Sequence, residues 1–526
     1  MLRKKLTVVR SRPIHQWCLL LSYRNPFDSV APNVVIRSLV RAVYPKLNTD
    51  PSRLEEYLFF TIRPPSIIFF LGTGLIAMVK SKEKKHRSGG NNLHVIQPNS
   101  AGIDIGASEI YVAVPFDRSD KPVRRFNTFT DDLHNAAKWL KECGIDAIAM
   151  ESTGVYWIPV FQILEAYGFD VILVNARHVK NVPGRKTDVN DCQWLQYLHA
   201  VGLLRGSFRP SQDICAVRSL LRHRDNLVKS ASSHVQRMQK SLTQMNLQIH
   251  NVISDITGVT GTKIIDAILA GERDPAKLAD LKDRRIKADK ETIAKSLTGD
   301  YRREHIFTLK QTVASYRHCL ELIQGCDAEI ESHLKEFESR IEVDPPPTPS
   351  TKSKAKGNAP NFDIKTHMHR VLGTDLTAID GISGLTAHVF FTEVGPDLSK
   401  FETVNHFSSW LGLCPNNKIT GGQIISSHTR PGSNRLAQAL RLSANSLWNS
   451  KSYLGDYFRR MRARHGAPKA ITATAHKLAR IIYHLVKNQK AFDETVFAEQ
   501  EQEHKKRLKK RLVSQAKALG LELIPA

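Results

Sequence analysis

The stretch that most constrains this chain is Lys186–Leu195, with the sequence KTDVNDCQWL, which begins as a basic loop and continues as an amphipathic helix. Asp188 and Asp191 are three residues apart, so on a helix they share a face, about one turn from each other. Two neighbouring carboxylates repel each other and need a compensating charge, which a divalent cation can supply. The alternative is a solvated helix start, because Asp is favoured in the first turn of a helix.

Charge and length narrow the class of protein. The chain has 526 residues, which predicts two or three domains, and a net charge of +25, which favours a polyanionic partner. Nucleic acid is the first candidate partner and an anionic membrane surface the second. None of the seven cysteines forms a Cys-x-x-Cys pair, which argues against a zinc ribbon and is typical of a reducing cytoplasm. The apolar run Ser66–Met78 is shorter than the roughly 20 residues that span a bilayer, so we expect no membrane segment.

Hydrophobic patterning divides the chain into six segments. Residues 1–99 form a basic extension without clean periodicity, in which Met78 is a candidate for the true start. The other five are an α/β domain (100–208), a helical stalk or coiled coil (209–342), a Pro/Ser/Lys linker (343–361), a mainly helical domain (362–490) and a basic tail (491–526).

The α/β domain has a recognisable order of elements. We expect three antiparallel strands, followed by a helix, a strand, a helix and a strand. This order is typical of an RNase H-like domain. The predicted strands are 101–106, 110–116, 124–129, 145–150 and 171–174, and the predicted helices are 131–143 and 155–167.

Two further carboxylates join the pair on the helix. Asp104 lies at the end of the first strand, and Glu151 directly follows the strand 145–150. Both strands are central in a sheet of this order, and a helix over that sheet brings Asp188 and Asp191 to the same place. Four acids in one cleft predict a site for one or two Mg²⁺ ions. Such ions could activate an attacking oxygen and stabilise a leaving oxygen at a phosphodiester.

Three stretches around these acids, GIDIG, MESTG and KTDVNDCQWL, resemble the DEDD domain of insertion-sequence transposases of the IS110 group. That domain is similar to the RuvC-type Holliday-junction resolvase. The resemblance extends over roughly 100–490 and implies that Asp104, Glu151, Asp188 and Asp191 hold the metal. The stretch DIGAS also resembles the first phosphate loop of sugar kinases and actin-like ATPases, which share this core fold. Those proteins need a second Gly-rich phosphate loop, which the sequence lacks after residue 200.

The segment Ile379–Ala387 predicts a helix, a Gly-rich turn and a second helix, as in a helix-hairpin-helix motif. In that motif, backbone N–H groups near the turn contact a DNA phosphate without reading sequence, which makes Gly381 and Gly384 candidate contacts. The alternative is an ordinary tight turn between helices.

The stretches LGLCPNNKITGG and TRPGSNR resemble the second, transposase domain of the same group. The resemblance implies a serine nucleophile before the glycines, which forms a covalent ester with a DNA strand. This chain has Thr420 at the matching position, so either Thr420 replaces the serine, or Ser426 or Ser427 does, or the activity is lost. Basic residues expected to contact nucleic acid are Lys186, Arg430, Arg435, Arg459, Arg460, Arg462 and Arg464.

Together these features predict a transposase that cuts and rejoins DNA at the ends of a mobile element and at its target. The resemblance further implies a homo-oligomer (a dimer or tetramer), a structured non-coding guide RNA, and a bacterial or archaeal cytoplasm with association to the nucleoid. The alternatives are a Mg²⁺-dependent junction nuclease that uses the four acids alone, and a decayed, non-catalytic nucleic-acid-binding protein.

Overall fold

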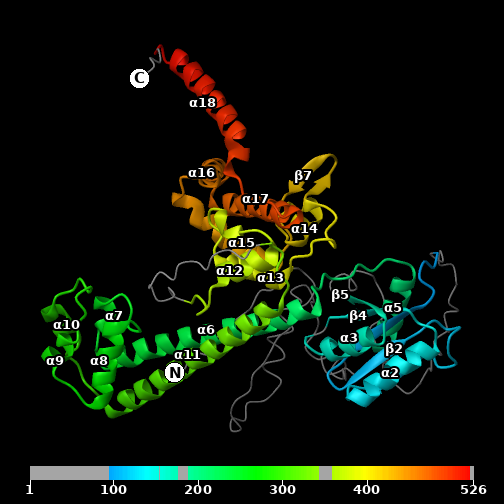
Figure 1. The fold of residues 1–526 in the computed structure, drawn as a ribbon, viewed down its shortest axis with the longest axis horizontal. Helices are drawn as coiled ribbons and strands as arrows, with labels where there is room; N and C mark the ends of the chain where they lie inside the picture. Colours follow the sequence, from blue (N-terminus) through cyan, green and yellow to red (C-terminus); the bar gives the residue numbers. More distant parts are fainter. Residues whose placement is uncertain (1–93, 153, 176–187, 343–357, 522–526) are drawn as a thin grey trace, which may run out of the picture. The chain divides into compact units, whose positions relative to one another are not determined.

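The computed structural model describes residues 94–152, 154–175, 188–342 and 358–521, without the side chains of 188–190 and of a few residues in the last helix (Figure 1). The description concerns the unit Leu93–Ala526. Met78, Lys186 and most of the linker predicted at 343–361 lie outside the described residues. In the described part of the chain, no helix is long and apolar enough to cross a membrane.

The α/β domain contains a five-stranded sheet with the strand order β3-β2-β1-β4-β5. β1, β2 and β3 are antiparallel to one another, whereas β4 and β5 run parallel to β1. This is the predicted succession of three antiparallel strands followed by helix, strand, helix and strand. The elements are β1 (Ser100–Ile105), β2 (Glu109–Ala113), β3 (Val123–Asn127), α2 (Thr130–Glu142), β4 (Ala147–Glu151), α3 (Trp157–Ala166) and β5 (Asp170–Val174).

Helices cover both faces of this sheet (Figure 1). Side chains alternate along a strand, so Ala101, Ile103 and Ile105 of β1 point to one face, where they share a core with α2 and α3. The opposite face of β1 is covered by α5 (Asp188–Ala200), which also contacts β2 and β4. Asp104 belongs to this second face because it alternates with Ile103 and Ile105.

Two long helices follow, α6 (Gln212–Gln244) and α11 (Arg303–Glu336), and they pack side by side as the predicted helical hairpin (Figure 1). The chain between them forms a lobe that the sequence reading missed. Its helices are α7 (Ile249–Val252), α8 (Val259–Ala270), α9 (Pro275–Asp280) and α10 (Lys290–Ser296). Gly271, with φ at 106°, ends α8, and Pro275 begins α9, so the long helical period is broken here.

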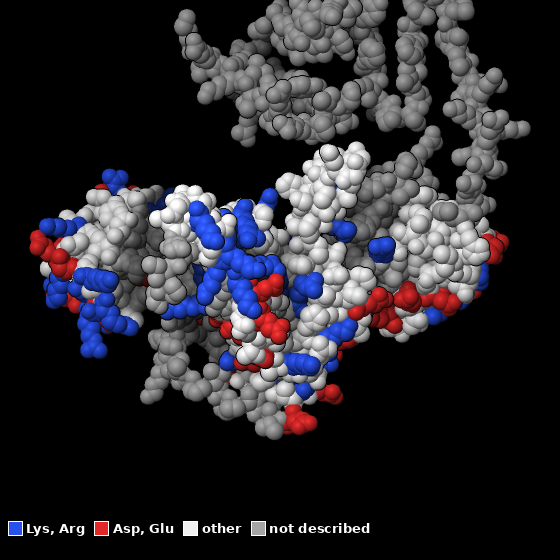
Figure 2. Space-filling view, turned by 90° about the horizontal axis from the view of Figure 1, so that it is seen from above, with Lys and Arg blue, Asp and Glu red and all other residues white. Residues whose placement is uncertain are grey.

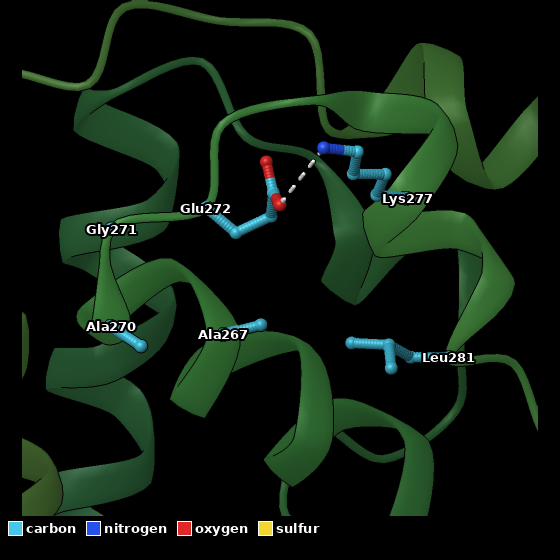
Figure 3. A pocket seen from close by; sticks show the side chains of 6 residues that line it. All are labelled: Ala267, Ala270, Gly271, Glu272, Lys277 and Leu281. Atoms are coloured by element: carbon cyan, nitrogen blue, oxygen red, sulfur yellow. Dashed lines mark ion pairs between the residues drawn. The ribbon is translucent and has the colours of Figure 1, made fainter.

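The lobe has its own core, which includes Ile264, Ile268 and Leu278. It also contains a pocket of about 560 Å³ lined by Ala267, Ala270, Gly271, Glu272, Lys277 and Leu281 (Figure 3). Glu272 and Lys277 form an ion pair of 3.8 Å there. With one neutralised carboxylate and mostly small apolar neighbours, this pocket contributes no candidate catalytic group.

The C-terminal domain is mainly helical and shares a core with the base of the long helices. Ile214 and Val217 of α6 and Ile330 and Leu334 of α11 belong to the same buried cluster as the C-terminal helices. The elements are α12 (Ile364–Leu372), η2 (Leu376–Ala378), α13 (Gly384–Glu393), α14 (Val404–Trp410), β6 (Lys418–Thr420), β7 (Gln423–Ser426), α15 (Arg435–Ser446), η3 (Leu447–Asn449), α16 (Tyr453–His465), α17 (Ala467–Asn488), η4 (Glu494–Phe497) and α18 (Ala498–Ala518).

A buried ion pair joins the two long helices. Arg224 of α6 and Asp327 of α11 pair with side chains only 5% and 3% exposed. The second carboxylate oxygen of Asp327 accepts a hydrogen bond from the backbone N–H of Asn361 at 3.1 Å. The pair therefore also fixes the chain where it enters the C-terminal domain.

Candidate active site

Asp104 and Glu151 lie at the same level of the sheet on neighbouring strands. β1 and β4 are parallel, and Ile103 lies opposite Met150 in their register. The same register carried one residue further places Asp104 opposite Glu151. Ile103 and Met150 both belong to the core with α2 and α3, so the two acids point to the face covered by α5. Both are half-buried.

Helix α5 lies directly against this face because β1 has no side chain at Gly102. A Cβ atom at Gly102 would lie 2.3 Å from the carbonyl oxygen of Cys192 and 2.3 Å from the backbone nitrogen of Gln196. Its neighbour on β4 is Ala149, which is also small. Gly102 and Ala149 lie two positions before Asp104 and Glu151 on the same face of the sheet. These two small residues therefore set how closely α5 approaches the acids.

The thiol of Cys192 lies near two of the predicted acids. Cys192 is fully buried, and burial raises the pKa of its thiol, with further contributions from the negative charges of Asp104 and Asp191, to about 12. One of these acids comes from the strand and the other from the helix. Asp191 directly precedes Cys192 on α5, Asp104 lies on the strand that α5 covers, and Glu151 lies beside Asp104 in register.

Asp188 is the first residue of α5, one turn before Asp191. Its side chain lies outside the described residues, as does Lys186 with the whole segment 176–187. The parts that these two residues play in the site remain predictions.

The donors fit a hard divalent cation, which prefers carboxylate oxygens. Among the described residues, Glu151 and Asp191 form no ion pair with Lys or Arg. Among the described residues, which leave out the Asp188 side chain, no three His, Cys, Asp or Glu are placed to hold a metal ion.

Thr420 is the last residue of β6 in a two-stranded hairpin. It pairs with Gln423 of β7, and Gly421 and Gly422 form the turn with φ values of 56° and 78°. Positive φ at both turn positions explains the two glycines, because other residues are strained there. Thr420 and Ser427 are exposed, whereas Ser426 is partly buried. The hydroxyl of Thr420 is thus accessible at the end of the hairpin.

Comparisons with known proteins match both of these regions. Residues 101–247 match the family model of the DEDD transposases of IS110, and residues 373–459 match the transposase family IS116/IS110/IS902. Both matching families are transposases of the IS110 type. The resemblance expected from the sequence is therefore confirmed.

A curated relative supports the same assignment. It is the insertion element IS110 uncharacterized 43.6 kDa protein of Streptomyces coelicolor, which is 38% identical over 90 residues. That stretch covers 17% of this chain and 22% of the relative, so the chain spans about a fifth of the length of the curated protein that it matches.

The first IS110-family match contains β1, β4 and α5, and the second contains the hairpin and the Gly-rich turn. At that turn, the expected helix-hairpin-helix is not confirmed: a single 3₁₀ turn, η2, precedes it. A Cβ atom at Gly381 would lie 2.9 Å from the carbonyl oxygen of Ser443, and one at Gly384 would lie 2.7 Å from Cγ2 of Ile364. These glycines allow close packing against α15 and α12, and their contact with DNA remains a prediction.

The predicted basic residues of the IS110-family domain have different surroundings. Arg435 pairs with Asp225 of α6 at 2.8 Å. Arg459 donates to the carbonyl oxygens of Trp448 and Ser450, at 3.0 and 2.6 Å, so it holds the turn before α16.

Three further arginines of the predicted set lie on α16, and a fourth, Arg430, is exposed before α15. The guanidinium of Arg462 lies 3.9 Å from the centroid of the Trp448 ring. Arg460 and Arg464 line a groove with Arg507 and Arg511 of α18.

The sequence reading missed Gly102 and the placement of the α18 arginines. The position of Gly102, two residues before Asp104 in the same strand, could have indicated that a helix approaches the strand closely there. The i, i+4 spacing of Arg507 and Arg511 within the basic run 504–511 could have indicated that these two arginines share one face of a helix.

Replacing Gly102 with Ala should damage the site without altering any acid. The new Cβ would overlap backbone atoms of α5, and overpacking of this kind costs about 1–3 kcal/mol of unfolding free energy. Because α5 must move away from Asp104, DNA cleavage should fall by roughly 100-fold, as expected for a displacement of about 1 Å. Urea unfolding and a cleavage assay measure the two effects.

Gly325→Ala is the matched control, since a Cβ there meets nothing within 4 Å in the middle of α11. This variant should leave the free energy of unfolding unchanged or raise it slightly. A Gly102→Ala protein with the stability and cleavage rate of the wild type would show that α5 is not held against β1 by this contact.

Proposed function

We propose that this chain is a recombinase that cuts and rejoins DNA phosphodiesters at the ends of an insertion sequence and at its target. The proposal is supported by the register that places Asp104 beside Glu151 on neighbouring strands, on the sheet face that α5 covers, with Asp191 on that helix. The strand order supports an RNase H-like domain of the RuvC type, and the family match supports DNA strand transfer.

In this proposal, Asp104, Glu151, Asp188 and Asp191 bind Mg²⁺, with two ions allowed by four carboxylates. The cation would supply activation of the attacking oxygen and neutralise the charge that develops on the phosphate. The half-buried setting of Asp104 and Glu151 limits the access of water, which strengthens their interaction with a cation.

Thr420 supplies the nucleophilic hydroxyl. Its oxygen would form a bond to the phosphorus of a DNA strand as the bond from phosphorus to the departing strand breaks. Thr420 is exposed and is followed by two glycines without side chains, so a DNA phosphate can approach its hydroxyl from solvent.

The partners follow from the family rather than from contacts within the chain. We propose that the protein acts inside the cell as a homo-oligomer, with DNA and a structured guide RNA. The net charge of +25 supports a nucleic-acid partner and does not distinguish DNA from RNA.

A covalent-trapping assay tests the reaction. The protein is incubated with Mg²⁺, end-labelled element DNA and the RNA transcribed from its flank, and a labelled protein band is sought under denaturing conditions. Thr420→Ala should abolish the band, and Thr420→Ser should preserve or strengthen it, because serine has the same hydroxyl without the methyl group.

Ser426→Ala and Ser427→Ala are the controls, since both residues lie close to Thr420 in sequence. Loss of the band in one of these, with the band retained in Thr420→Ala, would move the nucleophile to that serine. Cleavage without any covalent band would instead indicate a junction nuclease that uses the acids alone. A protein that binds DNA but gives neither cleavage nor a covalent band would be a decayed enzyme.

A further inference from the structure

The C-terminal part of the chain contains a basic groove that the proposed reaction does not use. It lies between α16 and α18 and has a volume of about 390 Å³. Arg460 and Arg464 line it from α16, and Arg507 and Arg511 from α18. The two arginines of each helix are four positions apart, so each helix presents a short row of guanidinium groups to the groove.

The turn η4, which leads into α18, is held against the start of α16, and this fixes the place where α18 begins. The rings of Tyr453 and Phe497 stack with centroids 4.5 Å apart and planes 2° apart. The ammonium of Lys477 lies 4.4 Å from the centroid of the Tyr453 ring. The backbone N–H of Tyr453 donates to the Glu494 carboxylate at 2.9 Å, which joins the start of α16 to the turn that precedes α18.

The charge in the groove is unbalanced. The residues that line it include four arginines and one carboxylate, Glu503, which pairs with Arg507. In the described part of the chain, Arg460, Arg464 and Arg511 have no ion-pair partner. Like charges facing each other across a groove are unfavourable unless an anion lies between them. Figure 2 shows Lys and Arg side chains gathered in the middle of the face that it presents.

We propose that this groove binds the sugar-phosphate backbone of a nucleic-acid strand. The guanidinium fork donates two parallel hydrogen bonds to phosphate oxygens, and two facing rows of arginine can hold successive phosphates. Tyr457, about one turn before Arg460 on α16, also lines the groove and adds an aromatic ring to its wall. The choice of nucleic acid over another polyanion rests on the proposed function.

Binding of fluorescein-labelled oligonucleotides to the full chain in EDTA, followed by anisotropy between about 50 and 200 mM salt, tests the proposal. Without metal, the strand is not cleaved, so the result does not depend on the proposed reaction. Single-stranded DNA, single-stranded RNA and duplex DNA of one sequence are compared, and the tightest ligand identifies the strand that the groove receives.

Arg464→Ala combined with Arg511→Ala should weaken binding by about tenfold per arginine and lower the salt slope by about 1 for each lost phosphate contact. Glu503→Gln should have the opposite effect and tighten binding several-fold, because it removes the carboxylate from the groove. Lys509→Ala is the matched control on the opposite face of α18, with little expected change.

Equal affinity and salt slope in the double variant and the wild type would overturn the proposal. So would polyglutamate of matched charge competing as well as unlabelled DNA, because the groove would then be a general anion site. Glu503→Gln keeps the test decisive if the double variant does not fold.

Discussion

Replacing Asp104 with Asn should reduce metal-dependent DNA cleavage by at least about 100-fold and leave the protein folded. The change removes one negative charge and keeps the shape of the side chain. A cation at a phosphodiester supplies several kcal/mol of stabilisation to the transition state, and each 1.4 kcal/mol corresponds to about tenfold in rate. Because Asp104 lies beside Glu151 and near Asp191, its loss should also weaken Mn²⁺ binding, which isothermal titration calorimetry measures independently of activity.

Asp170→Asn provides the comparison for this variant. Asp170 is an exposed carboxylate at the start of β5, at the opposite end of the sheet from Glu151. Cleavage and Mn²⁺ binding should both match those of the wild type. If Asp104→Asn and Asp170→Asn cleave DNA equally well, the four-acid site is wrong.

Replacing Asp327 with Ala should lower the free energy of unfolding by about 3–5 kcal/mol. The change leaves the guanidinium of Arg224 buried without a counter-charge, and the uncompensated charge is the main source of this cost. It also removes the acceptor for the N–H of Asn361. Urea unfolding measures the loss, and Asp327→Asn, which keeps one of the two acceptor oxygens that Arg224 and Asn361 use, should lose less.

An exposed pair on the same helix provides the control. Arg317 of α11 pairs with Asp266 of α8 at 2.6 Å, with side chains 49% and 46% exposed. Asp266→Ala should cost no more than about 1 kcal/mol, because water solvates the remaining arginine. The apolar double variant Arg224→Met/Asp327→Leu should recover much of the loss. Equal costs for Asp327→Ala and Asp266→Ala would mean that the Arg224 pair is not shielded from water.

The order of strands and helices in the α/β domain was predictable because it depends on local patterns. Alternating apolar residues in the first strand and a helical period after Asp131 are properties of neighbouring residues. Once three antiparallel strands are followed by helix and strand, β1 and β4 become neighbours, so the meeting of Asp104 and Glu151 followed from topology.

The lobe between α6 and α11 shows where this approach fails. Apolar residues such as Ile264 and Ile268 continue the helical period of the long helices, so the pattern predicted one extended hairpin. Gly271 and Pro275 interrupt the helix, and the resulting short helices fold back on a core of their own. Periodicity reports which side chains share a face, but not which partner covers that face.

The sequence by itself determined the order of strands and helices in the α/β domain and the excess of positive charge, and it predicted the four acids. Tertiary structure alone decided which arginines remain available: Arg459 donates to the carbonyl oxygen of Trp448, whereas Arg464 faces Arg511 across a groove. It also decided that Gly102 lies against the backbone of Cys192. The physical reason is that a strand or helix forms from its own neighbours, whereas a hydrogen bond, an ion pair or a close contact needs a partner from a distant part of the chain.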